Sequence, residues 1–140
     1  MSEAGPGRRR DLILAFAVIV EAVTGLALLI DPALVARLLL GVEGSAVAAL
    51  FERLFGIALL ALGLSCWPGV PPGGDRLAAD RAMLAYNLLI ALYLGYVGAA
   101  EHLAGWLLWP AVVFHLVMTV LLVWTGRGPS STMTNRTQTL

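Results

Sequence analysis

Four apolar stretches of about 20 residues each run through this 140-residue chain and restrict it to a small set of folds. They cover residues 12–30, 46–67, 82–100 and 104–125. A helix of about 20 residues crosses the ~30 Å hydrocarbon core of a bilayer, whereas a membrane β-strand needs only about 10 residues. The mean hydropathy of +0.86 is too high for a soluble domain of this size. We therefore predict an all-α integral membrane protein, a bundle of four transmembrane helices over residues 12–125.

The segments between these stretches support the count. Asp31 and Pro32 end the first stretch, because proline lacks an amide proton and restricts the residue before it. The apolar run 33–40 is too short to cross a bilayer, so we expect an interfacial half-turn or a short helix. A turn rich in proline and glycine at 68–74 precedes the charged run 75–81, which we expect to begin the third helix. The last two stretches form a tight hairpin.

Arginine sets the expected orientation, because the chain contains no lysine. Arg37 alone lies in a loop on the far side, whereas seven arginines lie on the side of the N-terminus: Arg8, Arg9, Arg10, Arg76, Arg81, Arg127 and Arg136. This bias predicts cytoplasmic N- and C-termini in a bacterial inner membrane. Residues 1–11 then form a basic cytoplasmic segment, and residues 126–140, rich in Ser, Thr and Asn, a disordered cytoplasmic tail. Glu21 interrupts the apolar run of a signal peptide, so the first span is expected to remain as an anchor.

Five side chains inside the predicted spans carry a carboxylate, guanidinium, amide or imidazole group: Glu21, Glu52, Arg53, Asn87 and His115. Such groups are costly in hydrocarbon, so they mark a buried polar site. At about 1.5 Å per residue, Glu21 and His115 both lie near the midplane, and Glu52 and Arg53 lie in the outer half. The positions four residues from Glu21, Glu52 and His115 are Ala, Gly or Thr, which allow close helix contacts. We therefore expect these groups to face the interior of the bundle.

The cluster has two interpretations. Arg53 could form a structural ion pair with Glu21 or Glu52, or the groups together could bind a proton or a ligand. Because two carboxylates face one arginine, we expect one of them to be protonated or hydrogen-bonded to His115. The candidate catalytic residues are Glu21, Glu52 and His115. The candidate ligand-binding residues are Glu21, Glu52, Arg53, Asn87, Tyr93 and His115.

Other kinds of site are not predicted. A metal site at His115 would need more nitrogen or sulfur ligands, and the second imidazole, His102, is expected at the outer surface. Cys66 is the single cysteine, so the chain cannot form an intramolecular disulfide. No phosphate-binding loop or hydrolase motif is present. The basic residues are too few and too dispersed for nucleic-acid binding. The sequence requires no cofactor, although a quinone is compatible with it.

Asp31-Pro32, the run Leu-Leu-Leu-Gly at 38–41 and the run Arg-Leu-Phe-Gly-Ile-Ala-Leu-Leu-Ala-Leu-Gly at 53–63 resemble the DoxX-like superfamily of small four-span bacterial membrane proteins. The resemblance covers residues 12–67 and extends to the remainder through span count and length. It implies a compact four-helix bundle, sometimes a small subunit or companion of a quinone-linked or thiol-linked oxidoreductase. Arg53 and Gly56 match positions of that pattern. The lack of a redox cysteine pair argues against an independent redox activity.

Three functions are compatible with these residues. The first is a membrane subunit or small-molecule-binding bundle, which would grip a quinone carbonyl or a lipid headgroup with Tyr93 or Tyr96 nearby. The second is a proton-coupled small transporter that acts as a homodimer through the stripe Ala91, Gly95 and Ala99. The third is an intramembrane enzyme that uses a carboxylate as acid or base on a lipophilic substrate. The expected partners are the lipid bilayer, a lipophilic small molecule, and a second copy or a partner membrane subunit.

Overall fold

The computed structural model describes residues 6–68 and 76–126, and every regular element within these ranges is a helix. The turn predicted at 68–74 and the tail predicted at 126–140 lie outside the described residues, apart from Pro68 and Gly126. Five helices follow one another: α1 (Pro6–Ile30), α2 (Pro32–Leu40), α3 (Ala46–Ser65), α4 (Arg76–Ala100) and α5 (Leu108–Gly126). All except α2 are long and apolar enough to cross a membrane. The predicted all-α class with four candidate spans is confirmed, and it indicates a multi-pass membrane protein.

Two helices extend beyond their apolar stretches, because charged residues with good helix propensity continue them. α1 already includes the arginines at 8–10, and α4 begins with the charged run 76–81. The last helix begins at Leu108 and not at 104, because residues 101–107 are used in the connection from α4. That connection is consequently longer than the predicted hairpin loop.

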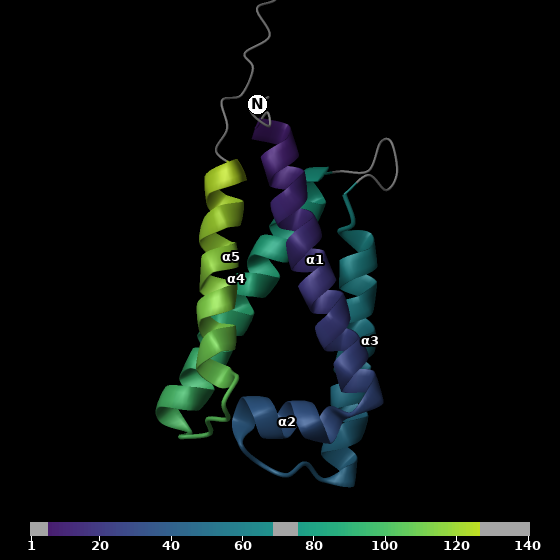
Figure 1. Cartoon of the computed structure of the whole chain (residues 1–140), viewed down its shortest axis with the longest axis vertical. Coiled ribbons are helices and arrows are strands. Elements are labelled where there is room, and N and C mark those ends of the chain that lie inside the picture. The colour runs from purple at the N-terminus through teal and green to yellow at the C-terminus, as the bar shows by residue number, and fades with distance from the viewer. Residues whose placement is uncertain (1–5, 69–75, 127–140) are drawn as a thin grey trace, which may run out of the picture.

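The four long helices form two pairs (Figure 1). α1 packs along α3, α4 packs along α5, and the pairs meet where α1 contacts α5 and α4. The start of α1 and the end of α5 lie at the same end of the molecule, and α2 lies across the opposite end. Near the first end, the guanidinium of Arg10 donates to the carboxylate of Asp80 and joins α1 to α4.

α1 and α3 come close at two glycines. A Cβ atom on Gly25 would lie 2.7 Å from the Gly56 carbonyl oxygen, and a Cβ atom on Gly56 would lie 2.6 Å from the Gly25 carbonyl oxygen. Only residues without a Cβ atom permit this approach of the two backbones. Gly25 lies four residues after Glu21 and Gly56 four residues after Glu52, so the small residues beside these acids do form a helix contact, as predicted.

The run 33–40 forms a short helix, one of the two predicted alternatives. The Asp31 carboxylate caps α2 by accepting a hydrogen bond from the Leu34 amide at 3.0 Å. Pro32 occupies the first turn, where its missing amide proton costs nothing. Gly41 ends the helix with a φ of 72°, a left-handed conformation that favours glycine.

The loop before α5 holds α2 in place. The amides of Gly105 and Leu107 donate to the carbonyls of Leu39 and Leu38, both at 2.8 Å, and so satisfy two carbonyls at the end of α2. A Cβ atom on Gly105 would overlap the Leu38 carbonyl, so the contact requires glycine at this position. Two segments that are far apart in the sequence therefore form one end of the molecule together.

The apolar core lies toward the end where α1 begins. Its buried members come from α1, α4, α5 and the residue after α3: Leu14, Ala17, Val18, Cys66, Met83, Met118 and Leu122. Many other large apolar side chains on the long helices are exposed, including Leu64 at 73% and Val120 at 65%. Such a surface suits contact with lipid acyl chains and not with water.

Candidate functional site

Glu21 lies near the middle of α1 and is only 1% exposed. The hydroxyl of Tyr86, on α4, donates a hydrogen bond of 2.8 Å to Glu21 Oε2. The second carboxylate oxygen, Oε1, lies 3.8 Å from His115 Nδ1 on α5 and has no hydrogen-bond partner among the described residues. The structure therefore brings Glu21 and His115 together, at the common depth that their positions in the sequence predicted.

Asn87 fixes the orientation of His115. The side chain of Asn87 is fully buried, and its Nδ2 donates to the Met83 carbonyl at 2.9 Å. A carbonyl only accepts, so this contact fixes which end of the amide is the nitrogen. Asn87 Oδ1 then faces His115 Nδ1 at 2.9 Å. Because an amide oxygen cannot donate, Nδ1 of the imidazole must carry the proton.

Tyr86 was not identified from the sequence, although it completes the polar group. Besides bonding Glu21, its ring packs edge-on against the imidazole of His115, with 5.8 Å between centroids. The available signal was its position: Tyr86 precedes Asn87 and lies seven residues, or two helical turns, before Tyr93. A face that carries Tyr93 therefore also carries Tyr86.

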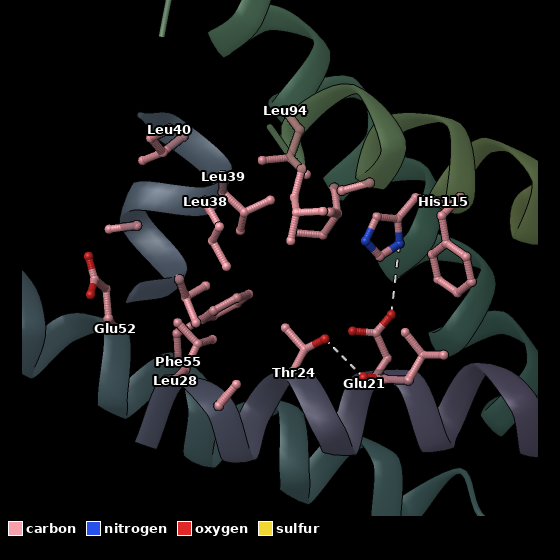
Figure 2. A pocket seen from close by; sticks show the side chains of 18 of the residues that line it. Glu21, Thr24, Leu28, Leu38, Leu39, Leu40, Glu52, Phe55, Leu94 and His115 are labelled. Carbon is pink, nitrogen blue, oxygen red and sulfur yellow. Dashed lines mark hydrogen bonds and ion pairs between the residues drawn. The ribbon is translucent and has the colours of Figure 1, made fainter. Parts of the chain in front are cut away.

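A cavity of about 570 Å³ opens beside these residues. Its walls come from α1, α2, α4 and α5, with Glu52 and Phe55 contributed by α3, and most of the lining is aliphatic. Figure 2 shows Glu21 and His115 at one side of the cavity and Glu52 at the other. We call the group of Glu21, Tyr86 and His115 the polar end. The cavity therefore combines apolar walls with a small buried polar group.

The adjacent residues Glu52 and Arg53 point in different directions, and only Glu52 lines the cavity. Glu52 lines the cavity, and its buried Oε2 has no hydrogen-bond partner among the described residues. Arg53 is exposed and is not part of the lining, and its Nε donates to the Leu29 carbonyl at 3.3 Å. Within the described residues it forms no ion pair with Glu21 or Glu52. Consecutive helix positions differ by about 100° around the axis, so the two side chains leave α3 in different directions.

The remaining candidates lie at the edges of the cavity or away from it. Tyr93 is part of the lining but is 63% exposed. Tyr96 is outside the lining, and its hydroxyl donates to Glu101 at 2.9 Å. In the stripe considered for dimerisation, Ala91 is buried within the protein, whereas Gly95 has open space where its Cβ would lie. Ala91 is therefore not available to a second copy.

No protein-family model matches the chain, and neither a curated protein nor a solved structure matches it. The resemblance to the DoxX-like superfamily thus stays a prediction from the residues that carry it.

Proposed function

We propose that this protein binds a lipophilic small molecule, quinone-like or lipid-like, in the cavity between its helices. It would do so as a membrane subunit or binding protein, a four-helix bundle in the inner membrane with both termini in the cytoplasm. The observation that carries this proposal is the unpartnered Oε1 of Glu21 beside an apolar cavity of about 570 Å³. Small-molecule sites commonly have this composition, with apolar walls, few polar groups, and a volume of about 300–1,000 Å³.

The buried carboxylate supports binding because an unsatisfied polar atom has a cost. Leaving one buried donor or acceptor without a partner costs about 1–3 kcal/mol. A ligand that supplies the missing partner recovers that free energy, and the aliphatic walls add the burial of its apolar surface at about 25 cal/mol per Å². Arg53, which the sequence suggested as a headgroup contact, is not included in this proposal because it is turned away from the cavity.

Mass spectrometry of small molecules that co-purify in mild detergent tests the proposal. Ala111 lines the cavity one helical turn before His115, so Ala111→Trp should fill the space and remove the ligand. Ala58 is exposed on α3 and lies outside the lining, so Ala58→Trp is the matched control and should retain the ligand. Equal ligand content in both variants would show that the bound molecule lies elsewhere.

A further inference from the structure

Three side-chain atoms beside the cavity have no partner among the described residues and accept hydrogen bonds when Glu21 and Glu52 are ionised. Glu21 Oε1 and Glu52 Oε2 are carboxylate oxygens with no partner among the described residues. The third atom is His115 Nε2. It points into the cavity (Figure 2) and forms no hydrogen bond with any residue that the structure describes. Because Nδ1 holds the proton of the neutral imidazole, Nε2 presents a lone pair.

The donors of the polar end are already used inside the protein. The Tyr86 hydroxyl donates to Glu21 Oε2, the Nδ1–H of His115 is directed at Asn87 Oδ1, and the Asn87 amide donates to Met83. The hydroxyl of Thr24, which also lines the cavity, donates to the Val20 carbonyl at 2.9 Å. With Glu21 ionised, the buried polar end thus offers acceptors, and its donors are all used within the protein.

We infer that the cavity selects apolar molecules that bring their own hydrogen-bond donor, a phenolic or alcoholic hydroxyl, to Glu21 Oε1 and His115 Nε2. This inference rests on the proposed function and narrows its ligand class. A hydroxyl can donate to either atom, whereas a carbonyl would place its oxygen against two other acceptors. Of a quinone and its reduced form, the reduced form with its two hydroxyls is the better match.

A matched pair of probes separates the donor requirement from lipophilicity. Para-nonylphenol and its methyl ether, para-nonylanisole, differ only in the hydroxyl proton that the ether replaces with a methyl group. Dodecanol and its methyl ether provide the same comparison without a ring. The dissociation constants of all four are measured by calorimetry on the full-length protein in lipid nanodiscs. Since an unsatisfied buried acceptor costs about 1–3 kcal/mol, we expect each ether to bind about 5- to 150-fold more weakly than its parent.

The two pairs also identify the source of the hydroxyl. A larger preference within the aromatic pair indicates a phenol or quinol, and a larger preference within the aliphatic pair indicates a lipid alcohol. Either result supports the inference. Ala58→Trp, which lies outside the lining, serves as the control and should keep both preferences.

Glu21→Gln should reverse the selection. Its amide oxygen can accept the bond from Tyr86, which places the NH2 group where Oε1 lay and turns an acceptor into a donor. The preference for the phenol should then fall at least about fivefold, and para-nonylacetophenone, whose only polar group is a carbonyl, should bind more tightly than to the native protein. If this variant does not fold, the comparison of phenol with ether on the native protein decides the question alone.

The failures are distinguishable. Equal binding of phenol and ether to the native protein, lost in Ala111→Trp, would overturn the donor requirement and leave the binding function intact. If none of the probes binds and no small molecule co-purifies, the binding function and the inference fall together.

Discussion

Replacing Gly56 by alanine tests whether the close glycine contact holds α1 against α3. The added Cβ atom would lie 2.6 Å from the Gly25 carbonyl oxygen and 3.1 Å from Leu28 Cβ. Cβ atoms essentially never lie within 3.0 Å of a non-bonded atom, and a backbone carbonyl cannot rotate away as a flexible side chain can. α1 and α3 must therefore move apart, and the contacts on both sides of the crossing loosen with them.

The magnitude follows from two opposing effects. Separating packed backbones by at least about 0.4 Å is overpacking, which costs about 1–3 kcal/mol. Alanine also gains up to about 1 kcal/mol in helix propensity over glycine. Gly63→Ala provides the matched control, because Gly63 is also in α3 and its Cβ would meet nothing closer than 3.5 Å. Propensity cancels between the two variants, so Gly56→Ala should be less stable than Gly63→Ala by about 1–3 kcal/mol.

Unfolding in mixed micelles, with increasing SDS and detection by tryptophan fluorescence, measures both variants against the native protein. Gly25→Ala introduces the equivalent clash from α1, because its Cβ atom would lie 2.7 Å from the Gly56 carbonyl oxygen. The two substitutions should therefore be non-additive when combined, since the first already separates the helices. A difference below about 0.5 kcal/mol between Gly56→Ala and Gly63→Ala would refute the steric reasoning.

Two further predictions concern the end with α2 and the orientation of the chain. Gly105→Ala should release α2, because the new Cβ overlaps a carbonyl of that helix. Hydrogen exchange of the α2 amides should then accelerate at least about tenfold. Gly126→Ala is the control and should leave the exchange unchanged, because there is open space around Gly126. In a Cys66→Ala background, Glu101→Cys should react with a membrane-impermeant maleimide on intact cells, and Arg8→Cys only after lysis. The opposite labelling pattern would reverse the proposed topology.

The sequence predicted well what depends on depth along a helix. Counting residues from the start of each span put Glu21 and His115 at one level, and the structure places them 3.8 Å apart. The small residues four positions from Glu21 and Glu52 identified a helix contact for the same reason, since spacing along one helix fixes which residues share a face. Asp31 and Pro32 likewise placed the break between α1 and α2, because their effect is local.

The sequence did not predict which side chains face the interior, because that depends on how each helix is rotated about its axis. The sequence shows that Glu52 and Arg53 are adjacent, but not which of them turns to the interior, and the structure turns only Glu52 toward the cavity. The spacing of Tyr86 and Tyr93 shows that they share a helix face, but not that this face turns toward Glu21 and His115. The contact of residues 105 and 107 with α2 joins segments more than sixty positions apart, and no local pattern signals it.

The polar end draws its members from both halves of the chain, and this has a consequence for synthesis. Glu21 enters the bilayer with the first helix, whereas Tyr86 and His115 arrive only with α4 and α5. A nascent chain that stops after α3 carries this acid inside a long apolar helix without Tyr86 or His115 beside it, and an acid at the centre of such a helix costs about 3 kcal/mol on insertion scales. Incomplete copies thus expose the Glu21 carboxyl group to lipid, whereas α4 and α5 cover it in the finished protein.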